Sequence, residues 1–446
     1  MDGIRCGRAW ESSVAGLLVA LLCVAAGGCR RSTQTDDASV VTISVWHPWG
    51  GTMGDPWERI VKAFEAAHPG IRVKPVFTQN DLSANQKFYT AVAASRPPEV
   101  VFVDGPQVAP WAEWGALEPL TDRINQAGIA ADDYYGPCWR QNHYGTDVWA
   151  LTFCADPNFA FVWNRALFRE VGLDPDRPPR TMDELDEYAA KLTKTDDQGR
   201  LTRIGFIPWG VYGSANSMFT WGWAFGGQFY DDVNRRITCT DPKIVRALEW
   251  MTSYADRYDV TKIASLQAGF GTAEQNPFYT GRLAMTCLLI AGIADIERFA
   301  PELDYGVAPQ PMPDGGEKDS SWVGGWCIAL PRGARHQDEG FEFIRWLCHD
   351  PGGTQTVGRE TGLFPGMRHS PYFDEVRNRK YYSTFLRILE ACKHQRPVMP
   401  VQAFYMRQMQ RAVDSAIYKQ KTAKQALEDA EKATQAELDL VLRGGE

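Results

Sequence analysis

Tryptophans beside glycines are the residues of this sequence best suited to binding chemistry. The chain has 16 tryptophans, and several stand in glycine-rich stretches instead of apolar runs. Trp221 and Trp223 lie in FTWGWAFGG, and Trp326 follows Gly325 in SWVGGW. An indole offers a rigid apolar face to the C–H face of a sugar ring, and a neighbouring glycine lets a ligand approach the backbone. These stretches are candidate sugar contacts, with packing in the core as the alternative for each tryptophan.

Three expected strands also end in side chains that could bind a ligand. Trp46 and His47 close the first strand, Gln79 and Asn80 follow the second, and Asp104 ends the third. Ligands of parallel α/β sheets gather at the carboxyl ends of the strands, so these five residues are candidate contacts. The alternative for Gln79 and Asn80 is an ordinary turn, and for Asp104 it is to cap the turn that follows.

Catalytic and metal-binding motifs are absent from the sequence. It has no HExxH, GxSxG, Walker loop or complete GxGxxG, and its seven histidines are scattered without metal-ligand spacing. We therefore expect no catalytic residue, no metal and no cofactor. A glycosidase needs only two facing carboxylates, and the 55 acidic residues leave that possibility open.

The elements that would position the candidate residues alternate between strands and helices. Apolar and β-branched residues predict strands at 41–46, 71–77 and 100–103, and helical spacing predicts helices at 57–70 and 83–95. This β-α-β-α-β order predicts a parallel sheet covered by helices.

The first 40 residues have the parts of an export signal. A short apolar run at 14–26 leads to AGGC and Cys29, which resembles the lipobox of bacterial lipoproteins. We expect a signal peptide over 1–28, lipidation of Cys29 and a polar tether over 29–39, so that acyl chains hold the mature protein outside the cytoplasm. The alternative is ordinary secretion with Cys29 incidental.

Net charge, cysteine content and apolar run length exclude or limit further properties. A net charge of −8 without a basic stripe argues against nucleic-acid binding. Three of the ten cysteines fall within the first 29 residues, and the other seven cannot all pair within one chain. Cys138 and Cys154 could close a loop, with buried free thiols as the alternative. The apolar stretch 283–294 is too short to span a membrane and predicts a buried strand followed by a turn.

Several segments together resemble the substrate-binding proteins of sugar-importing ATP-binding cassette (ABC) transporters, the family 1 extracellular solute-binding proteins that include maltose-binding protein. The resemblance covers nearly all of the mature chain and rests on segments in family order: PEVVFVD, WAEWGALEPLTD, the long segment 150–193, FYTGRLAMT, YGVAPQPMP, SWVGGWCIAL and DEGFEFIRWLCHDPGGTQTV. One departure is Leu288-Leu289-Ile290 after TGRLAMT, where relatives often carry a tryptophan that stacks on the ligand.

The resemblance implies a two-lobed α/β fold of the periplasmic-binding-protein type (type II-like). Each lobe would be a mostly parallel sheet flanked by helices, and several crossovers would form a hinge. We expect lobe one at 40–148 and 304–350, and lobe two at 149–303 and 351–446. The resemblance also implies that Tyr405 lines the cleft.

The implied function is that of a monomeric receptor that binds a carbohydrate between its lobes and hands it to an ABC permease. The partners would be the sugar, separate permease subunits and the membrane that holds the lipid anchor. Two alternatives stay open: a lipid-anchored glycoside hydrolase or lyase, and a receptor of the same fold for glycerol phosphate or another small solute. An anionic ligand would call for a cation in the cleft, and Arg359 is the candidate.

Overall fold

The computed structural model describes residues 40–79, 82–270 and 275–444, and in this part of the chain a five-stranded sheet is the largest. Its order is β2-β1-β3-β16-β6. β1 (Val41–His47) runs parallel to β2 (Ile71–Phe77) and to β3 (Val100–Asp104), which confirms the parallel arrangement predicted from the sequence. β16 (Trp326–Ala329) is antiparallel to β3, and β6 (Leu151–Thr152) pairs with its other edge.

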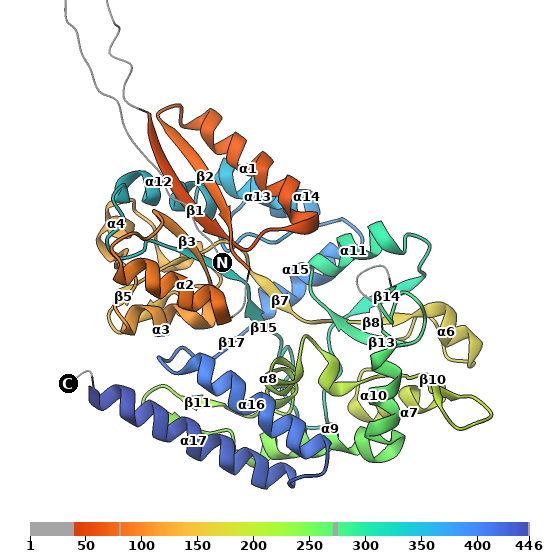
Figure 1. Cartoon of the computed structure of the whole chain (residues 1–446). Helices are drawn as coiled ribbons and strands as arrows, with labels where there is room; N and C mark the ends of the chain where they lie inside the picture. Colours follow the sequence, from red (N-terminus) through yellow and green to blue (C-terminus); the bar gives the residue numbers. More distant parts are fainter. Residues whose placement is uncertain (1–39, 80–81, 271–274, 445–446) are drawn as a thin grey trace, which may run out of the picture. The chain divides into compact units, whose positions relative to one another are not determined.

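Helices cover both faces of this sheet because successive strand side chains point to opposite sides. On one face, Phe102 joins a core formed with α1 (Gly54–Ala67) and α12 (Gln337–Cys348). On the other, Val101 and Val103 pack against side chains of α2 (Leu82–Ala93) and α3 (Val108–Glu113). The helices on the two faces are visible in Figure 1.

A second, smaller sheet lies at the centre of the other lobe. β8 (Ala160–Asn164) runs between β13 (Met285–Leu288) and β14 (Tyr305–Ala308) and is antiparallel to both. This lobe therefore differs from the expected mostly parallel sheet. Its core is completed by helices α7 (Met182–Leu192), α8 (Ser214–Ala224), α9 (Pro242–Tyr258), α16 (Gln402–Ile417) and α17 (Ala423–Gly444).

A third sheet joins segments far apart in the sequence, and we call it the crossover sheet. It consists of β7 (Asp156–Asn158), β15 (Trp322–Gly324) and β17 (His394–Gln395), with β15 in the middle. Figure 1 shows these strands near the centre of the molecule, between the two larger groups of elements. Each of the three chain segments therefore passes through one small sheet on its way between the lobes.

Helix α13 (Pro351–Thr361) packs against α1 and α12, so the segment after residue 350 begins beside the five-stranded sheet. Side chains of α14 (Tyr372–Val376) and α15 (Tyr382–Ala391) belong to the same core cluster. The remaining α-helices and strands are α4 (Thr121–Gln126), α5 (Gly136–Gln141), β4 (His143–Tyr144), β5 (Asp147–Val148), α6 (Arg165–Glu170), β9 (Lys194–Thr195), β10 (Leu201–Arg203), β11 (Tyr230–Asp231), β12 (Arg236–Ile237), α10 (Val260–Ala268) and α11 (Ala291–Phe299). The short 3₁₀ helices are η1 (Gly51–Met53), η2 (Gly105–Gln107), η3 (Ala131–Asp133) and η4 (Pro208–Gly210).

The structure settles three local points. The glycine-rich stretch with Trp221 and Trp223 is helical, because both residues lie in α8. The strand predicted within 283–294 is present as β13, but a helix, α11, follows it instead of a turn. Cys138 and Cys154 are free buried thiols, which is the alternative to a disulfide given above. No helix within the described residues combines the length and apolar character needed to cross a membrane.

Candidate functional site

The carboxyl edge of the five-stranded sheet brings together four of the predicted contacts. Trp46, Gln79, Asp104 and Trp326 line one small cavity of about 30 Å³. Three of them follow from the strand-end rule, because β1, β2 and β3 are parallel and end at this edge. Trp326 joins them because β16 is antiparallel and starts opposite Asp104. Asn80 and Cys29 lie outside the described residues.

His47 ends the same strand as expected but packs inward. The imidazole is only 5% exposed, and its ring centroid lies 5.0 Å from that of Trp57. Its Nδ1 atom accepts a hydrogen bond from the backbone N–H of Trp49 at 3.3 Å. Burial lowers the pKa of His47 to about 4, so the ring is neutral at physiological pH. His47 therefore supports the first loop and does not line the cavity.

Gly324 and Gly325 form a tight backbone junction between the crossover sheet and the five-stranded sheet, which we call the notch. Gly325 has φ of +117°, a conformation that disfavours any other residue, and a Cβ atom there would lie 2.1 Å from the carbonyl oxygen of Cys154. Its neighbour Gly324 pairs with Asp156 of β7 and directly precedes this turn. The backbone thus turns from β15 into β16 where Asn158 and Cys154 pack so closely that only glycine fits.

A carboxylate and a guanidinium flank that notch. Asp156 lies opposite Gly324 on one side, and Arg396 follows Gln395, the residue of β17 that pairs with Val323, on the other. The Arg396 Nη2 atom donates to Asp104 Oδ1 at 2.9 Å. Its guanidinium also lies over the ring of Trp322, 5.2 Å from the centroid. Arg396 therefore ties the crossover sheet to the carboxyl edge of the five-stranded sheet.

Two buried atoms of this set, Asp156 Oδ1 and Arg396 Nε, have no hydrogen-bond partner among the described residues. The Asp156 oxygen is the acceptor of the two, and the Arg396 nitrogen is the donor. Burial, followed by the negative charge of Asp104, raises the pKa of Asp156 from 3.8 to about 6. A buried acceptor without a donor is costly, so a ligand that supplies one gains affinity here. Ligand hydroxyl groups are suitable donors.

The three predicted contacts of the second lobe lie in its core. Trp221 is fully buried and donates from Nε1 to the carbonyl of Pro208 at 2.9 Å. Trp223 is 4% exposed and stacks on His394, with ring centroids 5.0 Å apart. Tyr405 is also fully buried and donates to the carbonyl of Phe229 at 3.1 Å. Their rings offer no free face in this structure, which favours the core alternative.

The cation near the site is not the one that the sequence suggested. Arg359 lies on α13 and pairs with Glu375 on the protein surface, with Nη2 and Oε1 2.7 Å apart. Arg396 stands beside Asp104 instead, and sequence reasoning missed it together with Asp156. Asp156 sits within the long segment that resembles the family crossover, and this was the available signal. No sequence signal pointed to Arg396, because only the pairing of β17 with β15 brings this residue to the notch.

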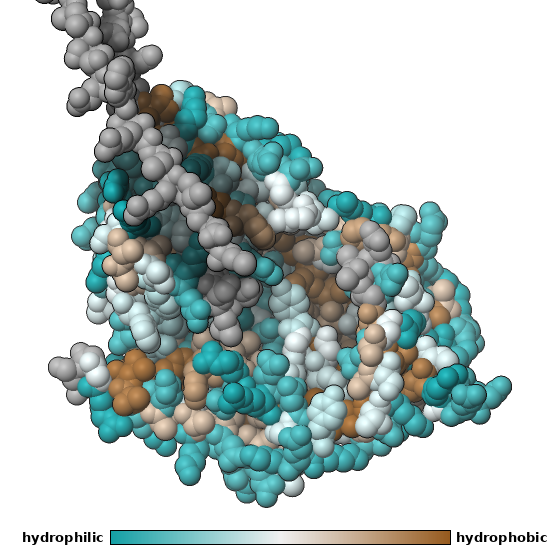
Figure 2. All heavy atoms as spheres, in the orientation of Figure 1, coloured by the Kyte–Doolittle hydropathy of each residue, from teal (hydrophilic) through white to brown (hydrophobic). Residues whose placement is uncertain are grey.

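Apolar surface is exposed near the crossover strands. The face seen in Figure 2 is hollowed near the crossover strands of Figure 1, and apolar residues gather within the hollow. Among the described residues no cluster of histidine, cysteine or acidic side chains is arranged to hold a metal ion. Carboxylate, guanidinium and indole groups beside apolar surface are suited to hold a polar ligand with an apolar face.

Comparison with known proteins shows which class this fold and site define. Residues 50–351 match the family model of the bacterial extracellular solute-binding proteins, and the chain belongs to that family. It is 23% identical over 308 residues to the sn-glycerol-3-phosphate-binding periplasmic protein of Escherichia coli strain K12, covering 66% of this chain and 67% of the relative. Its Shigella dysenteriae counterpart is 24% identical over 314 residues, with the same coverage.

Solved structures of two-lobed binding proteins share the fold. A mannobiose-bound protein, CpMnBP1, superposes with a TM-score of 0.78 at 26% identity, over 89% of this chain and all of that chain. The Mycobacterium tuberculosis protein UgpB, in complex with glycerophosphocholine, superposes with a TM-score of 0.73 at 22% identity, over 90% of this chain and 99% of the other. The chain is therefore a two-lobed solute-binding protein, and its role is that of a receptor.

Proposed function

We propose that this chain is a lipid-anchored receptor for a neutral carbohydrate, which it delivers to the permease of an ABC importer. The observation that carries the proposal is the unpartnered Asp156 carboxylate at the Gly324–Gly325 notch, beside Trp326. A sugar satisfies both features at once, since its hydroxyl groups donate to the carboxylate and its C–H face covers the indole.

Charge at the notch favours a neutral ligand over an anion. Arg396 is the cation there, and its Nη2 atom is already paired with Asp104, while its Nε atom has no partner among the described residues. Asp156 adds a further negative charge above pH 6. A phosphate would meet this carboxylate and would have to compete with Asp104 for Arg396. The mannobiose complex of the relative at 26% identity agrees with a carbohydrate ligand.

Glycerol phosphate or a glycerophosphodiester is the second candidate ligand class. The curated relatives named above bind sn-glycerol 3-phosphate, and Arg396 supplies a guanidinium at the notch. A second cation stands at the rim, where the Lys87 ammonium lies 4.6 Å from the centroid of the Trp46 ring. Movement of Arg396 away from Asp104 would free it for a phosphate group.

Calorimetric titration of the purified mature chain separates these candidates. We expect saturable binding of mannobiose or another neutral saccharide such as maltose, and weak binding of glycerol 3-phosphate and glycerophosphocholine. Tight binding of the two phosphates, with no binding across a panel of neutral mono- and oligosaccharides, would reverse the assignment.

The same material tests the hydrolase or lyase alternative, for which Asp104 and Asp156 are the carboxylates at the site. Prolonged incubation with oligosaccharides should leave them intact while they bind in stoichiometric amounts. Release of shorter products would favour an enzyme.

The N-terminal sequence supports the proposed location, and the family supports the proposed partners. Cleavage before Cys29 and acylation of its thiol would hold the protein on the outer side of a cell membrane, tethered through 29–39. There it would meet permease subunits on separate chains. Closure of the two lobes around the sugar would present the loaded form to the permease.

A further inference from the structure

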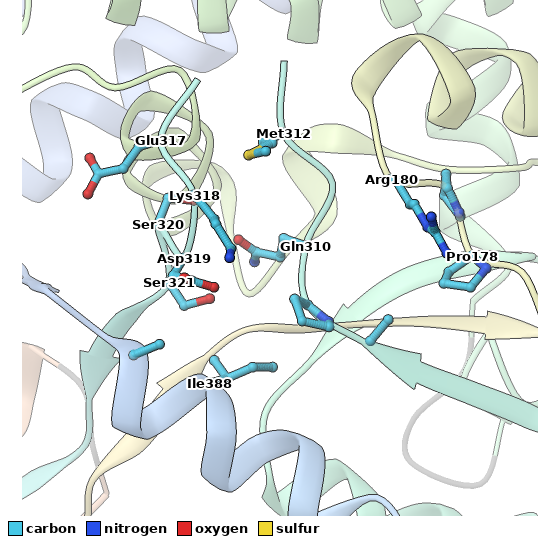
Figure 3. A pocket seen from close by; sticks show the side chains of 14 residues that line it. Pro178, Arg180, Gln310, Met312, Glu317, Lys318, Asp319, Ser320, Ser321 and Ile388 are labelled. Atoms are coloured by element: carbon cyan, nitrogen blue, oxygen red, sulfur yellow. The ribbon is translucent and has the colours of Figure 1, made fainter. Parts of the chain in front are cut away.

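A second pocket lies at the other end of β15, away from the notch. It has a volume of about 290 Å³, at the lower end of the range for small-molecule sites. The loop between β14 and β15 forms one side of it, with Gln310, Lys318 and Ser321 among the lining residues. Figure 3 shows the Gln310 amide and the Lys318 ammonium pointing toward each other across this space.

The walls of this pocket come from separate parts of the chain. Pro178 and Arg180 precede α7, and Ile388 and Ala391 belong to α15. In Figure 3, Pro178 and Arg180 lie on the side opposite Lys318, and Ile388 lies below. Proline, isoleucine and alanine side chains give this side an apolar surface. An occupant therefore needs an apolar body as well as a polar end.

The Gln310 side chain indicates the polar chemistry of that end. Both its Oε1 and Nε2 atoms are buried, and neither makes a hydrogen bond with a described residue. The Cys287 thiol is a polar neighbour of this amide. Burial raises the pKa of the thiol, and the Gln310 amide opposes the rise. A thiol is only a weak hydrogen-bonding partner for the amide. An unpaired acceptor and an unpaired donor on one amide match a ligand that offers a donor and an acceptor side by side.

A charged partner is also available at this wall. Within the described residues, the Lys318 ammonium makes no ion pair with a carboxylate. Glu317 is engaged with His394, whose Nε2 lies 3.0 Å from Glu317 Oε1. The ammonium can therefore donate to a carbonyl oxygen of an occupant.

We propose that this pocket is a second binding site, for a small amphiphilic carboxamide. The ligand amide pairs with the Gln310 amide, its carbonyl faces Lys318, and its apolar body rests on Pro178 and Ile388. This site is distinct from the carbohydrate notch, because the two lie at opposite ends of the three-residue strand β15, roughly 10 Å apart at 3.3 Å per residue.

The position of the pocket also connects the second site structurally to the notch. Ser321, in its wall, is followed directly by Trp322, whose backbone pairs with Asn158 of β7 and His394 of β17. The Trp322 ring lies beneath the Arg396 guanidinium. Ordering of the Lys318–Ser321 wall by a ligand should therefore stabilise the crossover sheet that carries Asp156 and Arg396.

Benzamide is a suitable probe, with benzoate as the comparator that lacks the N–H donor. We expect saturable benzamide binding to the sugar-free protein by calorimetry, at least fivefold tighter than benzoate. Gln310→Leu should weaken it at least tenfold, and Ala391→Phe, which fills the pocket, should abolish it. Gln126→Leu changes an exposed glutamine at the end of α4 and should bind like the parent.

Hydrogen exchange provides the readout for the crossover sheet. Benzamide should slow exchange of the Trp322 and Val323 amides in the parent and in Gln126→Leu, but not in Gln310→Leu. Absent binding, or equal affinities in all variants, would overturn the site, and unchanged exchange in β15 on saturation would overturn its link to the notch. Benzamide binding is measured without sugar, so it tests the second site even if the carbohydrate assignment fails.

Discussion

Arg396 and Asp104 are 292 positions apart in the sequence, yet their side chains form an ion pair with 2.9 Å between Nη2 and Oδ1. The Arg396 side chain is 10% exposed and that of Asp104 is 26% exposed, so water screens the pair only in part. The pair joins β3 of the five-stranded sheet to the segment after β17. It also leaves Asp156 as the carboxylate at the notch that is free to meet a ligand.

This ion pair should couple measurably in a double-mutant cycle. We expect Arg396→Met and Asp104→Asn each to destabilise the protein, and the double variant to lose less than the sum. A coupling of about 1–3 kcal/mol in the free energy of unfolding is reasonable for a partly buried pair. Chemical denaturation of the four proteins measures it, and additive losses would show that the pair contributes nothing. Arg359→Met, at the exposed pair with Glu375, is the control and should change stability by less than about 0.5 kcal/mol.

Asp156→Asn should weaken binding of a neutral saccharide by about tenfold or more at pH 7.5. The change keeps the shape but replaces a charged acceptor by an amide, and hydrogen bonds to charged groups contribute about 1.5–3 kcal/mol. Calorimetry with the saccharide found in the panel measures the loss. Asp197→Asn, in the turn between β9 and β10, is a suitable control and should leave affinity unchanged. Equal affinity in the Asp156 variant would remove this carboxylate from the site.

The raised pKa of Asp156 predicts a pH dependence. Because its folded pKa is about 6, the carboxylate takes up a proton as the pH falls below 6, and saccharide affinity should decline there. Between pH 3.8 and 6 the folded state binds more protons at this residue than the unfolded state, so its contribution to the free energy of unfolding falls as pH rises through that window. In Asp156→Asn both slopes should be reduced, and identical profiles in the two proteins would contradict the assignment.

Trp326 and the tryptophans of α8 should respond in opposite ways to truncation. Trp221→Ala and Trp223→Ala remove buried rings and should each destabilise the protein by about 3–5 kcal/mol, with the affinity of the folded fraction retained. Trp326→Ala, at the cavity edge, should instead weaken saccharide binding about tenfold. Melting temperature and affinity, measured for each variant, separate the two roles. A loss of affinity without a loss of stability in the α8 variants would restore their predicted role as ligand contacts.

Cys29→Ser should abolish lipid attachment and release the protein from the membrane fraction. Metabolic labelling with a radioactive or clickable fatty acid, followed by fractionation, tests this expectation. Cys23→Ser, within the apolar run, is the matched control and should remain labelled. Labelling of the Cys29 variant at the parental level would exclude this residue as the site of acylation.

Much of the first lobe could be predicted from the sequence because its signals are local. The β-branched runs at 41–46, 71–77 and 100–103 pair in parallel as expected, and the strand-end rule placed Trp46, Gln79 and Asp104 at one cavity. In the other lobe, Thr181 caps α7 through an equally local contact, its hydroxyl accepting from the Glu184 N–H at 3.1 Å. These features depend on neighbouring residues and on one simple topology.

Whether an aromatic side chain faces a ligand or the core was decided only by the tertiary structure. FTWGWAFGG folds as the end of a helix, on which residues two apart point about 200° from one another, and other elements cover both faces. The notch required β7, β15 and β17 to meet, which brings Asp156 and Arg396 to either side of Gly324 from distant positions. The sequence by itself determined the family, the parallel sheet and its ligand-binding edge. Burial and strand pairing between remote segments decided which residues line the candidate site. The sequence could not show this, because such contacts leave no periodic pattern along the chain.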